Sequence, residues 1–349
     1  MIQLRKKNLF GLDVGSYAIK MVELKEGKKG YQLINIGLAP IPPDAIVDGA
    51  LMDPGAIAEA ITALLAKTKV KLKDVATSIA GHSVIIKKIT LASMSDEELA
   101  DSIQWEAEQY VPFDIADVNL DFEILGPDPV DESQMEVLLV AAKKETIDDY
   151  TAVFAEAGLN PVVMDIDAFA CQNMLELNYP PDDGVVTAIV NIGAGLTNVN
   201  ILKDGASLFV RDVASGGNHF TEAIQKRFGV GQELADSAKL GASVEGVDSS
   251  GLKEVIRESM DGIASEVART LDFFLATNPD NNVDKVFISG GGARVKGLGA
   301  LMSDKLGVPV EIVDPFQMIN FNKKYAEMIA AEGPSFGVAV GLAIRKAGD

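Results

Sequence analysis

The sequence contains few of the residues that stabilise disulfide-rich or zinc-binding proteins. It has one cysteine, Cys171, and two histidines among 349 residues. A single cysteine excludes an internal disulfide framework, and two histidines cannot form the common three-histidine zinc site. Neither His82 nor His219 has potential metal ligands at a recognisable spacing, so we expect neither to be catalytic. Cys171 lies in an apolar helical segment, which favours a buried packing residue over a nucleophile.

Long apolar runs are also lacking. Charged residues or glycines interrupt every candidate before it reaches the roughly 18–20 residues of a membrane-spanning helix. Residues 1–10 include basic residues but no apolar core of a signal peptide. These features predict a cytoplasmic protein that does not insert into a membrane by itself.

Basic residues are scarce relative to acidic ones. The chain has 31 Lys and Arg residues against 51 Asp and Glu residues, which gives a formal net charge of −20. This charge repels nucleic-acid phosphates and anionic lipids, so we expect no nucleic-acid partner, although segment 69–73 contains three lysines. With 48% hydrophobic residues, the chain is long enough for roughly two or three globular domains.

The most informative pattern is an internal repeat. Residues 9–37 predict a strand, a glycine-containing tight turn, a second strand, a polar turn and a third strand. Residues 188–215 predict the same elements in the same order. Helical patterns follow both, at 54–67 after the N-cap Asp53 and at 250–277. The repeat predicts two similar α/β domains that face each other.

An α+β segment at 83–162 interrupts this duplication, and we predict that it is an inserted subdomain. Its helix at 96–111 begins with Ser95 and Glu98 at the spacing of a capping box. Trp105 lies off the apolar stripe of this helix, where it is either a core residue or a partner contact. The other elements that we expect are strands at 83–91, 119–125 and 135–142 and a helix at 147–157.

The first candidate ligand site is the turn Asp13-Val14-Gly15-Ser16. Gly15 has no Cβ, so the backbone N–H groups of the turn can approach an anion closely. Asp13 can hold Mg²⁺ through water, and Lys20 can add positive charge near a phosphate. A single hairpin of this kind is more often a plain turn.

The second hairpin, at 191–197, strengthens the phosphate interpretation. It repeats the turn with Gly193 and Gly195, and Thr197 can donate a hydroxyl hydrogen bond. Two such loops on paired domains can clamp a polyphosphate between them. Gly216 and Gly217 follow the third strand, where backbone without side chains can approach the same phosphates.

A third glycine-rich element follows the strand predicted at 285–289. This strand runs into Gly290, Gly291 and Gly292 and then into a predicted helix. Backbone at a triple glycine can lie flat against a base or ribose, and a helix N-terminus favours nearby negative charge.

In this order the three elements resemble the phosphate-1, phosphate-2 and adenosine motifs of the superfamily of actin, heat-shock ATPases and hexokinase. Segment 232–239 resembles the helix whose charged residues contact ribose in bacterial actin-like proteins, and 334–342 resembles the C-terminal connecting helix. The resemblance implies an α/β actin-like ATPase fold with two duplicated ribonuclease-H-like domains and the α+β insertion in the first. The implied division is a first domain (1A) of 8–82, 163–184 and 334–349, an inserted subdomain (1C) of 83–162, and a second domain (2A/2B) of 185–333, with 2B at about 219–283.

The same resemblance implies ATP and Mg as ligands, with Asp13 at the metal, through water. The residues implied to bind the nucleotide are Asp13, Gly15, Ser16, Tyr17, Ala18, Lys20, Asn191, Gly193, Ala194, Gly195, Thr197, Gly216, Gly217, Asn218, Asp236, Lys239, Gly290, Gly291, Gly292, Ala293 and Arg294.

The sequence departs from the superfamily at Asn191, where an aspartate is usual. Because an amide is no general base, we hypothesise slow hydrolysis or binding without turnover. Asp165 and Asp167 are the candidates for positioning an attacking water, although capping of the following helix is the favoured interpretation for both.

The inserted segment distinguishes the branch of the superfamily. With its strand at 83–91, the helix containing 104–113 and the segment 138–144, the chain is similar over nearly its whole length to the PilM family of FtsA-like proteins of type IV pilus assembly. This implies a peripheral protein at the cytoplasmic face of the bacterial inner membrane. The implied partner is the N-terminal cytoplasmic segment of the membrane protein PilN, bound in a groove between the first domain and its insertion. Pilus motor ATPases and self-association are further candidates.

Two alternatives use the same fold. A small-molecule kinase needs a catalytic aspartate beside the acceptor hydroxyl, and no sequence motif identifies a residue for that role. A membrane-anchored filament former of the FtsA or MreB type needs a basic amphipathic C-terminus, whereas residues 342–349 read Leu-Ala-Ile-Arg-Lys-Ala-Gly-Asp. The favoured interpretation is a scaffold in which ATP closes the two halves and changes how the insertion meets its partner.

Overall fold

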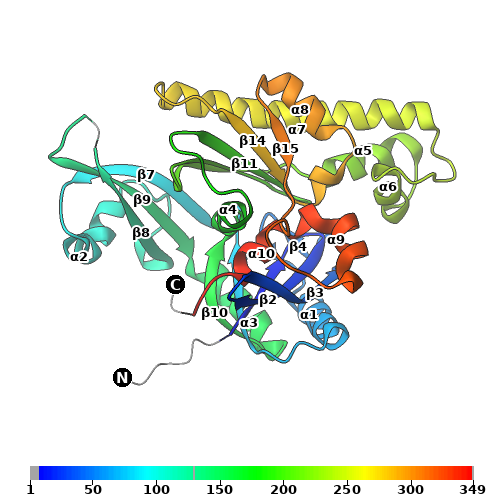
Figure 1. Cartoon of the computed structure of the whole chain (residues 1–349), viewed down its shortest axis with the longest axis horizontal. Helices are drawn as coiled ribbons and strands as arrows, with labels where there is room; N and C mark the ends of the chain where they lie inside the picture. The colour runs from blue at the N-terminus through cyan, green and yellow to red at the C-terminus, as the bar shows by residue number, and fades with distance from the viewer. Residues whose placement is uncertain (1–7, 129, 348–349) are drawn as a thin grey trace.

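The framework of the fold is a pair of five-stranded sheets of the same design. The computed structural model describes residues 8–128 and 130–347, and within them each sheet joins an antiparallel three-strand meander to two parallel strands (Figure 1). The predicted domain end at 348–349 and residues 1–7 of the segment inspected for a signal peptide lie outside the described residues. No helix within the description is long and apolar enough to cross a membrane.

The first sheet has the strand order β10-β6-β1-β2-β3. In it β1 (Phe10–Val14) pairs antiparallel with β2 (Ala18–Gly27), which pairs with β3 (Gly30–Pro40). On the other side β6 (Asp74–Ile79) lies parallel to β1, and β10 (Asn160–Ile166) lies parallel to β6. Every residue of β1 is buried, because packed elements cover both faces of the sheet.

The second sheet repeats this arrangement as β13-β12-β11-β14-β15. Its meander matches the first at the turn: Asp13 lies opposite Lys20 in the first sheet, and Asn191 lies opposite Asn198 in the second. The internal repeat predicted from the sequence is thereby confirmed. The strands are β11 (Val186–Ile192), β12 (Thr197–Lys203), β13 (Ala206–Val213), β14 (Lys285–Ser289) and β15 (Val310–Ile312).

Helices cover the outer faces of the two sheets. The first sheet is covered by α1 (Pro54–Thr68) and α3 (Lys144–Glu156), and the second by α7 (Ser249–Thr277) and α8 (Leu298–Leu306). The start of α1 agrees with the sequence, because the Asp53 carboxylate accepts a hydrogen bond from the Ala56 N–H at 3.0 Å.

Shorter elements complete the chain. The helices α5 (Asn218–Phe228) and α6 (Gln232–Lys239) share a small apolar core with the start of α7. The others are β4 (Ile46–Val47), β5 (Ala50–Leu51), α9 (Ala326–Glu332) and the 3₁₀ segments η1 (Ile115–Asp117), η2 (Gly291–Arg294), η3 (Lys323–Tyr325) and η4 (Gly333–Phe336).

The insertion contains a three-stranded antiparallel sheet, whose strands β7 (Val84–Ala92), β9 (Gln134–Lys143) and β8 (Val118–Pro127) lie in that order. One face is covered by α2 (Asp96–Ala107), whose Ser95–Glu98 capping box is present as predicted. This helix ends four residues before the predicted end, since the residue before Pro112 is pushed out of the helical conformation and the last turn loosens. Trp105 is 76% exposed on α2, which excludes the core alternative.

The boundary of the insertion follows the packing of its last elements. Tyr150, Val153 and Phe154 of α3 join the core beneath the first sheet, and β10 is a strand of that sheet. Residues from 144 onward therefore pack with the first half rather than with the three-stranded sheet. The domain division as a whole stays a prediction.

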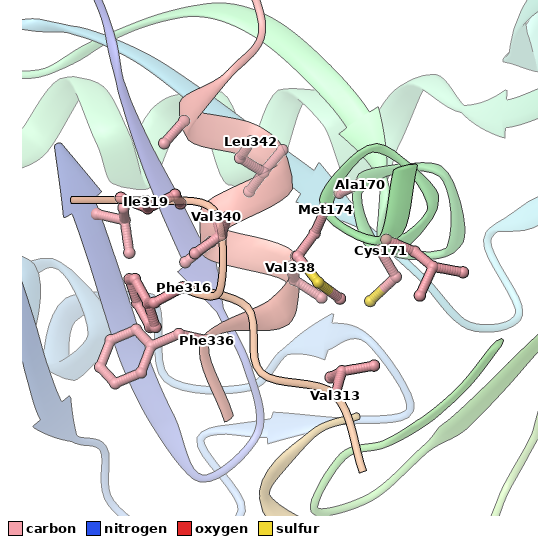
Figure 2. Packing of buried hydrophobic residues seen from close by; sticks show 14 of the residues in the cluster. Ala170, Cys171, Met174, Val313, Phe316, Ile319, Phe336, Val338, Val340 and Leu342 are labelled. Atoms are coloured by element: carbon pink, nitrogen blue, oxygen red, sulfur yellow. The ribbon is translucent and has the colours of Figure 1, made fainter. Parts of the chain in front are cut away.

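The two halves share one continuous core between their sheets. It is built around α4 (Asp167–Asn178) and α10 (Gly337–Ala343), which lie between the sheets and cross each other (Figures 1 and 2). Cys171 is fully buried there, and burial raises the pKa of its thiol, so the predicted packing role is confirmed. Figure 2 labels Ala170, Cys171, Met174, Val313, Phe316, Ile319, Phe336, Val338, Val340 and Leu342 of this core.

Glycine permits the crossing of α4 and α10. A Cβ added at Gly341 would overlap the backbone carbonyl of Ala170, and one added at Gly11 would lie 2.6 Å from the Ala343 nitrogen. Both neighbours are backbone atoms, which cannot rotate away as a side chain can. The helices and β1 are therefore in direct backbone contact, and any side chain at Gly341 forces them apart.

We expect Gly341→Ala to destabilise the protein by about 3 kcal/mol, the upper part of the usual range for overpacking a core. The measurement is the urea or thermal midpoint of the purified variant. Gly262→Ala is the matched control, because an added Cβ within α7 meets the His219 ring nitrogen only at an ordinary 3.6 Å. That variant should gain roughly 0.5–1 kcal/mol from helix propensity. Equal midpoints for the two variants would contradict the proposed overlap.

Candidate functional site

A deep cleft of about 630 Å³ separates the two halves on the side where their meanders turn. Its size lies within the roughly 300–1,000 Å³ typical of small-molecule sites. All but two of the residues that the sequence implied for nucleotide binding line it. The structure thus brings together both hairpins, the triple glycine and α6, which are far apart in the sequence.

The two exceptions are Thr197 and Ala293, and their predicted contact with a ligand is corrected. The Thr197 hydroxyl is buried and donates to the Ser215 carbonyl oxygen at 2.7 Å, so it ties the end of β12 to the segment after β13. Ala293 is fully buried in the core under the second sheet. Each residue follows the motif in sequence but faces the interior of its own half.

The two hairpins touch across the floor of the cleft. The Gly195 N–H donates to the Ser16 hydroxyl oxygen at 3.2 Å. In the second turn the Gly193 N–H donates to the Leu196 carbonyl at 2.8 Å, which closes it tightly. A ligand between the halves therefore meets both turns together.

Glycines keep side chains out of this part of the cleft. A Cβ at Gly216 would lie 2.6 Å from the carbonyl oxygens of Gly193 and Ala194. The N–H groups of Gly217 and Asn218 donate to the same carbonyls at 2.8 and 2.9 Å, so the start of α5 rests on the second turn. The result is a stretch of backbone without side chains at a helix N-terminus, where the helix dipole favours negative charge.

Acidic side chains and one lysine form the floor of the cleft. The Lys20 ammonium donates to the Asp13 carboxylate at 2.9 Å, and both side chains are largely buried. The Ser78 hydroxyl donates to the Asp167 carboxylate at 2.6 Å beside them. Burial and then the charge of Asp13 raise the pKa of Asp167 to about 7, while the Ser78 hydrogen bond acts in the opposite direction.

The favoured capping interpretation of Asp165 and Asp167, at the start of α4, is wrong. At the start of α4 the described residues form no side-chain cap hydrogen bond. Asp167 instead lines the cleft, whereas Asp165 lies outside it, where its carboxylate accepts from the Ile166 N–H at 2.7 Å and pairs with Arg345 at 3.4 Å. Of these two aspartates, only Asp167 is therefore placed to contact a ligand in the cleft.

Some lining residues carried no signal in the sequence. Tyr150 reaches the cleft from α3 and donates to the Gly49 carbonyl at 3.3 Å, and burial raises the pKa of its phenol. Ser78 also lines the cleft. The positions of these two residues depend on the packing of distant elements, and neither belongs to a local motif. His219 lines the cleft as well, directly after the predicted residues Gly216, Gly217 and Asn218.

Two ion pairs line the cleft. Lys239 donates to Asp236 at 2.7 Å and to the Thr221 hydroxyl at 2.8 Å, so the two charged residues predicted on α6 form one hydrogen-bonded unit. Arg294, directly after the triple glycine, pairs with Glu332 at 2.5 Å. Tyr17 lies between these pairs and remains 47% exposed.

The donor set suits a hard cation that keeps most of its own ligands. Within 8–128 and 130–347, no group of three or more His, Cys, Asp or Glu side chains could enclose a metal ion. Mg²⁺ is commonly held by one or two carboxylates together with water and phosphate oxygens. Asp13 and Asp167 supply such carboxylates at the floor of the cleft.

Comparisons with known proteins identify the fold as actin-like. A family model described as type IV pilus assembly protein PilM matches residues 11–347. The solved PilM–PilN type IV pilus biogenesis complex matches with a TM-score of 0.85 and 31% identity, over 97% of this chain and 98% of that chain. The ethanolamine utilization protein EutJ from Carboxydothermus hydrogenoformans matches with a TM-score of 0.60 and 17% identity, over 96% and 89%. MreB5 of Spiroplasma citri bound to ADP matches with a TM-score of 0.54 and 15% identity, over 95% and 94%.

The raised pKa of Asp167 predicts a pH-dependent stability. Between about pH 4 and pH 7 the folded state holds a proton that the unfolded state has lost, so wild-type stability falls as the pH rises through this range. Asp167→Asn removes this dependence. We expect the variant to exceed wild type by ~4 kcal/mol near pH 8 and by less than ~2 kcal/mol near pH 5.

Urea midpoints of both proteins across this range measure the difference. Ser78→Ala, which removes the hydrogen bond that favours the ionised carboxylate, should move the change to higher pH. A stability difference that stays constant with pH would contradict the assignment to Asp167.

Proposed function

The chain belongs to the family of type IV pilus assembly protein PilM, and we propose that it is an ATP-binding scaffold of the pilus assembly platform. In this proposal it binds the N-terminal cytoplasmic segment of PilN and is held by it at the cytoplasmic face of the inner membrane. The nucleotide state changes the affinity for that segment. Pilus motor ATPases and a second copy of the chain are further candidate partners.

The observation that carries the nucleotide proposal is the cradle where the two hairpins meet. Phosphates fit beside the turns around Gly15 and Gly193, because both glycines lack a Cβ, the small Ser16 hydroxyl and the Lys20 ammonium lie beside them, and the α5 N-terminus adds a favourable field. Asp13 and Lys20 lie at the same floor as counter-groups for a cation and an anion. A bound Mg²⁺ would supply charge neutralisation of the phosphates.

The remainder of the cleft suits a nucleoside. Asp236 and Lys239 present a fixed charged pair at the position proposed for ribose. In the same cleft, Gly290 to Gly292 offer bare backbone and Arg294 a planar cation, which can stack against a base. These groups support ATP as the ligand.

The partner groove that we propose lies along the seam between the inserted sheet and the first half. Val84, Ile86 and Val140 of this sheet pack against the core of the first half. The insertion is thus attached by a side-chain interface as well as by its two chain connections. A relative shift at this interface changes the shape of a peptide groove beside it, which gives the nucleotide a route to the partner.

The hydrolysis proposal follows from the groups beside the phosphate turns. Asn191 is neutral, and its NH₂ group is already engaged by Asn198 at 3.0 Å. Asp167 is the remaining carboxylate beside Asp13 in the cleft, and it already accepts a hydrogen bond from the Ser78 hydroxyl. We therefore propose slow turnover, and a phosphate-release rate far above background would overturn it.

We expect Asp13→Asn to weaken Mg-ATP binding at least about tenfold, because it removes the charge facing the cation but keeps the side-chain size. Calorimetry with Mg-ATP measures the change, and in EDTA wild type and variant should bind ATP more nearly alike. Asp53→Asn is the matched control, since it caps α1 outside the cleft. Unchanged Mg-ATP affinity in Asp13→Asn would refute the metal assignment.

A PilN peptide tests the scaffold itself. We expect a synthetic peptide of the PilN N-terminal segment to bind, with an affinity that Mg-ATP changes roughly 5- to 150-fold, the usual size of coupling between two sites. Calorimetric titrations with and without Mg-ATP measure both quantities. Binding that ignores the nucleotide would remove the coupling and keep the scaffold, whereas no binding would remove the scaffold.

A further inference from the structure

The second hairpin carries a chain of three polar side chains where the first carries an ion pair. Asn191 and Asn198 occupy the register positions that Asp13 and Lys20 occupy in the first sheet. The Asn191 NH₂ group donates to the Asn198 side-chain oxygen at 3.0 Å. The Asn198 NH₂ group then donates to the Asp212 carboxylate on β13 at 2.7 Å.

Asp212 fixes the direction of this chain. A carboxylate only accepts hydrogen bonds, so Asn198 must turn its NH₂ group toward Asp212 and its oxygen toward Asn191. Asn191 must then donate its own NH₂ group. The Asn191 Oδ1 atom accepts no hydrogen bond from the described residues, so it can accept one from a ligand in the cleft that Asn191 lines. It lies next to Gly290, where an added Cβ would be only 2.7 Å from it.

The other oxygen of Asp212 reaches into the first half of the protein. It accepts a hydrogen bond from the Gly81 N–H at 2.7 Å. Gly81 has φ +87°, and an added Cβ would lie 2.7 Å from the Asp48 carbonyl and 3.2 Å from a Leu196 methyl group. It is therefore confined between the two halves.

Gly81 is also where the insertion begins. Its carbonyl accepts the Val84 N–H at 3.0 Å, which starts β7. The Asp212 carboxylate thus accepts hydrogen bonds from two places, from Asn198 at the end of the polar chain and from the Gly81 backbone at the entrance of the inserted sheet. The bond from β13 to Gly81 crosses between the halves, so any change in their separation acts on it.

We infer that Asp212 is a positioning residue that couples the cleft to the inserted subdomain. A ligand that donates a hydrogen bond to Asn191 Oδ1 polarises the two amides of the chain. It thereby changes the strength of the hydrogen bond from the Gly81 N–H to Asp212, since hydrogen bonds in series strengthen one another. The coupling rests on the nucleotide site proposed above and gives its path to the insertion. It also explains the asparagine at 191, because an aspartate there could not donate to Asn198.

Amide hydrogen exchange of the full chain tests the inference without any variant. Magnesium with the non-hydrolysable analogue AMPPNP is the probe, and its binding is checked by calorimetry. We expect it to change exchange in the segment 80–92, which contains Gly81 and β7. Nucleotide binding without any change in this segment overturns the inference and leaves the proposed nucleotide site intact. A lack of nucleotide binding overturns both.

Asp212→Asn tests the role of the carboxylate. Asn198 and Gly81 donate to different oxygens of the carboxylate, and in an asparagine an NH₂ group, which cannot accept, replaces one of these oxygens. We expect nucleotide affinity to change less than about threefold, because Asp212 lies outside the cleft lining, while the nucleotide effect on 80–92 falls by at least about half. The ratio of PilN-peptide affinities with and without nucleotide should move toward one.

Asp204→Asn is the matched control. The Asp204 carboxylate also accepts a glycine N–H, from Gly184 at 2.7 Å, but neither residue lines the cleft. It should keep the full exchange response. Thermal midpoints show whether each variant is folded. A folded Asp212→Asn variant with the wild-type response in 80–92 overturns the inference, as does an equal loss of response in Asp204→Asn.

Discussion

The structure depends on the close crossing of α4 and α10 between the two sheets. Backbone touches backbone there because residues 11 and 341 are glycines, and this brings the two five-stranded sheets onto one shared core. The turns of both meanders then open onto the same cleft, since α4 begins at its floor with Asp167. A wider crossing would separate the hairpins and leave Gly195 without its hydrogen bond to Ser16.

The repeated halves could be predicted because their signals are local. A strand, a glycine turn and a second strand lie within a few residues, and a pattern that occurs twice is unlikely to arise from an isolated turn. The same local view failed at Thr197 and Ala293, which follow the motifs in sequence but point into their own cores. Alternation along β12 decides the direction of Thr197, and the packing of η2 against the core of the second half decides that of Ala293.

Residues that reach the cleft from distant elements could not be found in the sequence. Tyr150 and Ser78 have no neighbours in sequence that suggest a site, and Asp167 looked like a helix cap because aspartate is common there. Each acquires its role only when α3, β6 and α4 pack around the floor. The domain ends are similar: the sequence placed α3 in the insertion, but its apolar face completes the core of the first half.

The two hairpins have the same strand register but carry different side chains beside the cleft, charged in the first and neutral in the second. In the first, Lys20 neutralises Asp13 at short range, so this half presents a compact ion pair to whatever enters the cleft. In the second, Asn191 and Asn198 are neutral, and the negative charge lies farther from the turn, on Asp212, to which Asn198 donates a hydrogen bond. The second hairpin has no carboxylate at the position of Asp13, but Asp212 lies two hydrogen bonds away from Asn191, at the seam between the halves. These hydrogen bonds form a polar connection from the cleft to the entrance of the insertion.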